Sequence, residues 1–218
     1  MSWVQRVCLL FPILAVGNFN GQAEPASGGE PAGSPGITIR FFNYAQLPAK
    51  TLNSAKDRVT AIYHRTGIEV DWVECPVGDQ DPSVYPACTE VWDATHLFLH
   101  LLPQASKTTK VERAGESLLG ARMAKIYWDR VRQRSGRLQV EPEWILAYVI
   151  AHEVGHLLLG SNSHSPTGVM AEKWGREEII SISQSGLSFT TQQAEFIRAE
   201  VQRRKNKQVS AEQPITPS

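Results

Sequence analysis

The side chains best suited to chemistry lie in one short segment, His-Glu-Val-Gly-His at residues 152–156, followed by His164. On a helix, residues four apart differ by about 40° around the axis, so His152 and His156 project from one face, a turn apart. Two imidazoles so placed can bind one Zn²⁺ at about 2.0–2.1 Å each. Glu153 follows the first ligand, where its carboxylate can take a proton from a metal-acidified water. The pattern predicts a hydrolytic zinc site with Glu153 as general base.

This chemistry requires a helix that holds the two imidazoles rigidly. Residues 144–151 form an apolar run, and together with the motif they predict a buried helix over residues 142–159. Gly160 can end that helix in a left-handed conformation. His164 then returns eight residues after His156, near enough to complete a three-ligand site with one position open to water. The alternative interpretation is a buried helix with two core histidines and an unrelated loop histidine.

The segment resembles the metzincin group of zincin metallopeptidases, whose signature is His-Glu-x-x-His-x-x-Gly-x-x-His followed by a Met-turn. His152, Glu153 and His156 match it position for position, and Met170 in Thr-Gly-Val-Met resembles the methionine beneath the metal. Short exported bacterial proteins with the same run are similar as well. The resemblance implies a zincin-like α+β fold, with a small twisted mixed sheet backed by helices. It also implies a Zn²⁺ cofactor and peptide or protein substrates.

The spacing departs from the metzincin signature after the second histidine. Three residues, rather than two, separate His156 from Gly160 and Gly160 from His164. Zincins of another class use a glutamate on a later helix as the third ligand. The acidic alternatives to His164 in this chain are Glu172, Glu177 and Glu178.

The elements before the motif predict a sheet. Residues 37–44 and 68–73 have strand patterns, and a helical pattern over residues 48–65 joins them, which favours a parallel pair. A third strand is expected at 95–102. The remaining expected elements are one or two strands within 117–131, a turn-rich segment at 160–189, and a last helix at 191–204.

Several residues have two open interpretations. Residues 124–129 are either the edge strand that pairs with extended substrate or an ordinary strand of the sheet. Tyr148 either stabilises an oxyanion or is a core residue with a bonded hydroxyl. His96 and His100 lie on one predicted strand with Cα atoms roughly 13 Å apart, which is too far to share a metal.

The two ends of the chain differ in composition from the middle. Residues 1–23 are typical of a signal peptide, with Arg6, an apolar run at 7–16 and small residues before a cleavage site. Residues 24–36 are rich in Pro, Gly and Ser and predict a flexible linker. We expect one domain over 37–206, a disordered tail at 207–218, and a secreted or periplasmic protein.

Cleavage of the signal peptide would leave two cysteines, Cys75 and Cys88. In an exported chain this pair favours a disulfide, and the alternative is two separate buried thiols.

Composition excludes several classes of protein. The 22 basic and 22 acidic residues give no net charge, so we expect no nucleic-acid partner. No apolar run reaches the roughly 18 residues of a spanning helix, so we expect no membrane partner after signal cleavage.

We expect a monomeric, secreted zinc-dependent endopeptidase. The second hypothesis is an exported, zinc-stabilised binding or structural protein without turnover.

Overall fold

Five strands form one sheet in the computed structural model, which describes residues 34–78, 81–110 and 112–212. The strands are β1 (Gly36–Asn43), β2 (Glu69–Cys75), β3 (His96–Leu102), β4 (Gly115–Leu118) and β5 (Met123–Tyr127). Their order in space is β2-β1-β3-β5-β4, and only β4 runs antiparallel to its neighbour. The predicted mixed sheet is present, with an antiparallel strand at one edge.

The opening strand–helix–strand unit forms as the sequence predicts. Helix α1 (Ala49–His64) joins β1 to β2, and the two strands pair in parallel. Alternate residues of β1, namely Ile37, Ile39 and Phe41, are buried on one face of the sheet. Because successive strand side chains point to opposite faces, this alternation places the core on the face that the long helices cover.

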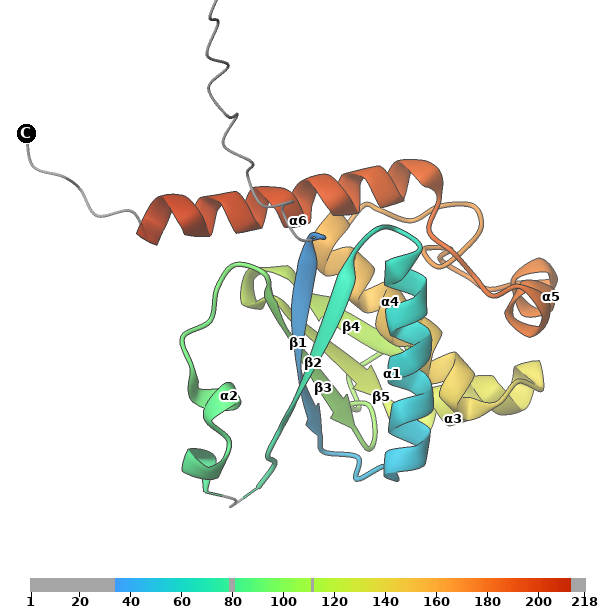
Figure 1. Cartoon of the computed structure of the whole chain (residues 1–218). Coiled ribbons are helices and arrows are strands. Elements are labelled where there is room, and N and C mark those ends of the chain that lie inside the picture. The colour runs from blue at the N-terminus through green and yellow to red at the C-terminus, as the bar shows by residue number, and fades with distance from the viewer. Residues whose placement is uncertain (1–33, 79–80, 111, 213–218) are drawn as a thin grey trace, which may run out of the picture. The chain divides into compact units, whose positions relative to one another are not determined.

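The other helices are α2 (Pro86–Thr89), α3 (Trp128–Leu138), α4 (Pro142–Leu159), α5 (Arg176–Gln184) and α6 (Thr191–Glu212). Of these, α2 lies between β2 and β3 in the chain, and α3 to α6 come after β5 (Figure 1). Short 3₁₀ turns occur at Pro82–Val84 and Leu119–Ala121. No helix in the described part of the chain combines the length and apolarity needed to cross a membrane.

Helix α4 lies at the centre of the molecule and matches the predicted bounds. It packs against α1, α3 and α6, and against strands β4 and β5. Pro142 stands in the first turn, where its missing N–H is not needed. Most side chains on every side of α4 are buried, from Ile145 to Leu158, which explains why its sequence is apolar all round. The central position gives the two motif histidines a rigid base.

Three expectations about secondary structure are wrong. The strand predicted through Val131 ends at Tyr127, and α3 begins at Trp128. This helix buries only Val131 and Ser135, so its sequence shows little helical periodicity. Residues 176–184, expected to be turns, form α5, where the Glu178 carboxylate accepts a hydrogen bond from the Gly175 N–H.

The last helix also extends further than predicted, to Glu212, so residues 207–212 of the expected disordered tail are helical. Glu200 pairs with Arg203 and Arg204 at 2.7 Å each, contacts that stabilise a mostly polar helix. Its narrow apolar face consists of the buried residues Ala194, Ile197 and Val201. The signal peptide predicted at 1–23 and most of the linker at 24–36 lie outside the described residues.

Cys75 and Cys88 form a disulfide, with Cα atoms 5.7 Å apart. The bond joins the end of β2 to α2 and closes the loop that leads to β3. It confirms the predicted pairing and excludes two separate thiols.

Replacing both cysteines by alanine should lower the free energy of unfolding by roughly 3 kcal/mol, because a loop of this length is no longer closed in the unfolded chain. Chemical denaturation with and without a reductant measures the loss. The reductant should destabilise the wild type and leave the double variant unchanged. Equal stability of the two proteins without reductant would contradict the structural role of the bond.

Candidate metal centre

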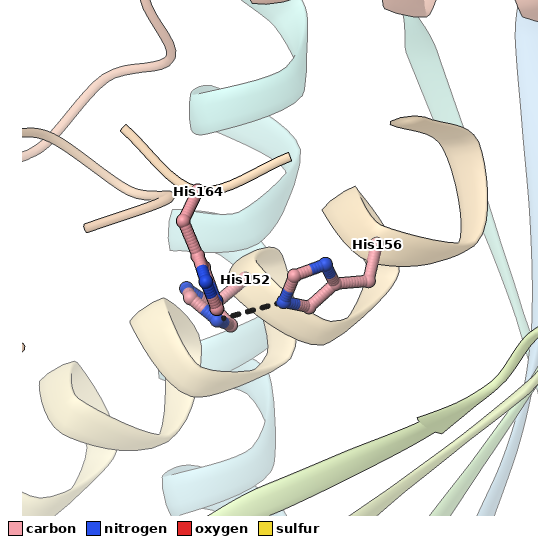
Figure 2. A group of neighbouring side chains, drawn as sticks. All are labelled: His152, His156 and His164. Atoms are coloured by element: carbon pink, nitrogen blue, oxygen red, sulfur yellow. Dashed lines mark hydrogen bonds between the residues drawn. The ribbon is translucent and has the colours of Figure 1, made fainter. Parts of the chain in front are cut away.

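Three histidines come together at one point of the structure. His152 and His156 project from α4, and His164 reaches toward them from the segment that follows the helix (Figure 2). One ring nitrogen from each lies within 4.8 Å of the other two, an arrangement that could hold a metal ion. The structure thus brings the two helix histidines and His164 together.

Hydrogen bonds fix which nitrogen of each helix imidazole faces the centre. The Nδ1 atom of His152 lies 2.9 Å from the Val169 carbonyl oxygen, and Nδ1 of His156 lies 3.2 Å from the Gly160 carbonyl oxygen. A carbonyl oxygen only accepts, so each Nδ1 carries the hydrogen and each Nε2 keeps a free lone pair. The Ser163 hydroxyl donates to the same Gly160 oxygen and accepts from His156.

The two Nε2 atoms lie 3.1 Å apart, although neither has a hydrogen to donate to the other. Two lone pairs this close repel unless a cation lies between them. A tetrahedral ion bound at about 2.0–2.1 Å holds its nitrogen ligands roughly 3.3–3.4 Å apart, close to the observed separation. The donor set therefore fits a metal ion of this size.

Burial keeps the helix imidazoles neutral. It lowers the pKa of His152 to about 4 and, to a smaller extent, the pKa of His156, with the neighbouring histidines adding repulsion. A neutral imidazole is the form that binds a metal, so protons do not compete for these sites near neutral pH.

The longer spacing before His164 is accommodated by the chain around it. Gly160 ends α4 with φ +93° and ψ 177°, an extended conformation that only glycine adopts readily, rather than the predicted left-handed helical one. Next to His164, the Ser163 carbonyl accepts a hydrogen bond from Gln193 Nε2 at 3.0 Å. On the other side, the Ser165 N–H donates to the Met170 carbonyl at 3.0 Å. Both flanking residues are therefore held, and His164 is directed between them.

The acidic alternatives to His164 do not join this group. Among the described residues, the cluster of possible ligand atoms contains His152, His156 and His164 and no carboxylate. Glu178 is already used to cap α5, and Glu177 is exposed. The remaining acid, Glu172, lines the nearby cleft without belonging to the cluster.

The Glu153 side chain is 8% exposed and lines the same cleft as the three imidazoles. Burial raises the pKa of its carboxyl to about 7, against the opposing effect of a hydrogen bond from Ser117. The Ser117 hydroxyl contacts both the Glu153 carboxylate and the Glu153 backbone carbonyl, the latter at 2.9 Å. A Cβ on Gly115 would lie 2.6 Å from Cγ of Glu153, so β4 can approach the carboxylate only because it has glycine here.

Met170 is fully buried beneath α4. A Cβ on Gly155 would lie 2.5 Å from its sulfur, so the methionine occupies the space that the glycine leaves. Gly155 directly precedes His156, and the Met170 turn supplies the Val169 carbonyl that binds His152. The contact between Gly155 and Met170 therefore helps to orient both His152 and His156.

A cleft of about 830 Å³ opens in front of the histidines. It is bordered by β4, by the α3 residues Arg134 and Arg137, and by residues 171–174. Strand β4 forms the edge of the sheet, with one side paired to β5 and the other free of strand partners in the described chain. Residues 124–127 lie inside the sheet as part of β5, so of the two interpretations of that segment the ordinary strand is correct.

The other residues considered from the sequence are structural. The Tyr148 hydroxyl is buried and accepts a hydrogen bond from the Leu187 N–H at 3.2 Å, which identifies it as a core residue. His100 packs between the rings of Phe42 and Tyr44, away from the metal group.

Sequence reasoning missed Gly115, Ser117 and Gln193, all of which position the site. Ser117 is 36 residues from Glu153 in the chain, and Gln193 is 30 residues from Ser163. Spacing along one helix carries no information about such distant contacts. The capping pattern Thr-x-x-Gln at 190–193 was the one available signal, because it marks the start of α6.

Comparisons with known proteins show a similar fold. No protein-family model and no curated protein matches the sequence. Among solved structures, archaemetzincin from Methanopyrus kandleri is 17% identical, with 79% of this chain and 99% of that chain covered and a TM-score of 0.50. A zinc-dependent peptidase from Methanocorpusculum labreanum (strain Z) is 10% identical, with 75% and 99% covered and a TM-score of 0.43. The likeness to archaemetzincin agrees with the predicted zincin-like α+β fold.

Gly155→Ala should destabilise the protein by about 1–3 kcal/mol, because the new methyl group and the Met170 sulfur cannot occupy the same space. Thermal and chemical denaturation measure the change. Met170→Ala is the matched variant, because it removes the sulfur that would clash with the new methyl group but leaves a cavity.

In the double variant the two losses should be clearly less than additive. Additive losses would show that the two residues do not share this contact. The control is Gly136→Ala on α3, where an added Cβ meets nothing within 4 Å.

Proposed function

We propose that this chain is a secreted, zinc-dependent endopeptidase. One observation carries the proposal: a group of three possible metal ligands and a buried carboxylate line the same open cleft. Carbonyl oxygens bind the Nδ1 atoms of His152 and His156, so the free lone pairs of both rings face the point that His164 also reaches. A structural metal site needs no such carboxylate and no cleft. Similarity of fold to an archaemetzincin supports the assignment.

His152, His156 and His164 would hold Zn²⁺ and leave a fourth position facing the cleft. When bound, zinc supplies a Lewis acid and lowers the pKa of a coordinated water. Glu153 accepts the proton of the attacking water and delivers it to the leaving amine of the cleaved peptide. Ser117 keeps the carboxylate in place through its contact with Glu153, while Gly115 leaves room for it.

Strand β4 would align the substrate. Its outer edge has no strand partner in the described chain, and its residues Gly115 to Ser117 line the cleft beside Glu153. An extended peptide can add to such an edge through main-chain hydrogen bonds, whatever its side chains are. A substrate bound in this way can continue past both ends of the strand, which supports cleavage within a chain rather than only at its ends.

Export is part of the proposal and depends on two features. The signal peptide predicted at residues 1–23 would direct the chain out of the cytoplasm, to the periplasm or beyond. The Cys75–Cys88 disulfide supports this, because such bonds persist in oxidising compartments and are rare in the cytosol.

A binding or structural protein stabilised by zinc is the second candidate. The observation in its favour is that His164 belongs to the segment after α4, so a metal would tie that segment to the central helix. In this case the metal would raise stability and Glu153 would have no role in turnover.

The purified chain should contain close to one equivalent of zinc, measured by elemental analysis. His164→Ala should weaken zinc affinity by orders of magnitude, since two imidazoles leave half of the tetrahedron without protein ligands. Competition with a fluorescent chelator gives the constants.

Glu172→Ala and Glu177→Ala are the matched controls, and both should keep nearly the wild-type affinity. The opposite ranking would assign the third ligand to a carboxylate. Less than half an equivalent of zinc in the wild type would contradict a zinc site altogether.

Glu153→Gln should abolish hydrolysis of a broad peptide library while zinc content stays unchanged, because the amide cannot accept a proton. Mass spectrometry of the digested library and elemental analysis of the same sample test both statements. Cleavage of peptides by the wild type but not by Glu153→Gln identifies the protein as an enzyme. Identical behaviour of the two proteins on every peptide favours the binding protein.

A further inference from the structure

Arg134 is a cation held in a defined orientation on the wall of the cleft. It projects from α3, and its Nη2 atom donates to the Glu112 carbonyl oxygen at 2.9 Å. Its guanidinium carbon lies 5.3 Å from the centroid of the Trp174 ring, within the range of a cation–π contact. The backbone bond and the aromatic ring restrict the guanidinium plane, while most of its five N–H groups remain available.

Arg134 forms no close ion pair with a carboxylate in the described part of the chain. The arginines that do form ion pairs there are Arg130, Arg203 and Arg204, each of which has a carboxylate within 4.0 Å. Arg134 instead lies near a second cation, Arg137, one turn further along α3. Burial and then the repulsion from Arg137 lower the pKa of Arg134.

Both arginines line the cleft that contains the three histidines. The charge of Arg134 acts on both His152 and Glu153, so the guanidinium lies within electrostatic range of the metal centre and of the carboxylate. In the free protein Arg137 repels the partly buried Arg134, and the Glu153 carboxylate offsets this repulsion only in part. An anionic group bound in the cleft would relieve that repulsion.

We propose that Arg134, flanked by Arg137, forms a carboxylate-binding subsite, which selects peptides carrying a carboxylate close to the bond that is cut. The inference rests on the proposed peptidase function. The carboxylate belongs either to an Asp or Glu side chain or to the C-terminus of the peptide, since both present the same two oxygens. A guanidinium binds them through two parallel N–H···O bonds, which a lysine cannot reproduce.

Binding is measured first, apart from turnover. The zinc-loaded Glu153→Gln variant is titrated with an acetylated, amidated octapeptide of neutral residues. The same octapeptide is then used with Asp at each position in turn, with Asn as the neutral isostere, and with a free C-terminal carboxylate. At one position, or at the free C-terminus, the acidic peptide should bind about ten- to a hundredfold more tightly than its neutral counterpart. Equal affinity of every acidic and neutral pair would overturn the proposal.

The position of the preference along the peptide distinguishes the two sources of the carboxylate. Preference for Asp at an internal position identifies a side-chain subsite. Preference for the free C-terminus alone identifies a site for chain ends and would replace endopeptidase by carboxypeptidase activity. Either result supports the carboxylate-binding role of Arg134 if the variants below remove the preference.

Arg134→Gln, added to the Glu153→Gln background, should remove the preference, and Arg134→Lys should restore only part of it. The matched control is Arg132→Gln, which changes an exposed arginine of the same helix that does not line the cleft. It should bind all peptides as the parent does. Circular dichroism and thermal unfolding verify that each variant is folded. Arg113 also lines the cleft, and its charge acts on Glu153. Arg113→Gln therefore tests the competing assignment: loss of the preference there, with retention in Arg134→Gln, would overturn the role of Arg134.

Cleavage rates separate this inference from the peptidase proposal. In the active protein, Arg134→Gln should lower kcat/KM for acidic peptides about tenfold or more relative to kcat/KM for neutral peptides, and this difference should appear in KM. An equal loss of kcat for all peptides would make Arg134 part of the catalytic machinery and overturn its role in selection. If the wild type cleaves no peptide, the peptidase proposal fails, while the titrations still decide whether Arg134 binds a carboxylate.

Discussion

The hydrogen bonds that hold the Nδ1 atoms of His152 and His156 are the constraint on which the site depends. An imidazole has two tautomers, and a free ring would present either nitrogen to the cleft. Here the carbonyl oxygens of Val169 and Gly160 select one tautomer in each ring and leave both lone pairs directed at one point. Both carbonyls belong to the segment after α4. The path of that segment is therefore as important to the metal centre as the helix that carries the ligands.

This dependence explains why the neighbourhood of the site is built around close contacts of small residues. Gly155 lets Met170 pack against α4, and the methionine brings with it the carbonyl that binds His152. Gly115 similarly lets β4 approach the Glu153 carboxylate. In both places a side-chain atom lies where a Cβ would otherwise be. Larger residues would push the ligands or the carboxylate away, although neither glycine takes part in chemistry.

Sequence reasoning succeeded where the determinants are local. The helix over 142–159 was predicted with its bounds, because an apolar run with Pro at the start and Gly at the end is a complete signal. The β1-α1-β2 unit followed from periodicity, and the disulfide from a count of two cysteines. Helix α3 was missed because its sequence, Trp-Asp-Arg-Val-Arg-Gln-Arg-Ser-Gly-Arg-Leu, buries only Val131 and Ser135 and shows little apolar periodicity. The contacts of Ser117 and Gln193 depend on how distant segments pack, which spacing does not encode.

The missed helix also carries the most distinctive charges of the cleft. A helix with few buried apolar residues has a weak intrinsic reason to pack against the molecule, and α3 does so through the buried Val131 and the partly buried Trp128 and Leu138. Burial and the repulsion from Arg137 make the charge of Arg134 unfavourable, and the buried Glu153 carboxylate offsets this only in part. Proteins retain such unfavourable charges mainly where a ligand compensates for them. In this molecule Trp174 and the Glu112 carbonyl hold the Arg134 guanidinium at the wall of the cleft. The side chain therefore does not rotate into solvent, where its repulsion with Arg137 would be weaker.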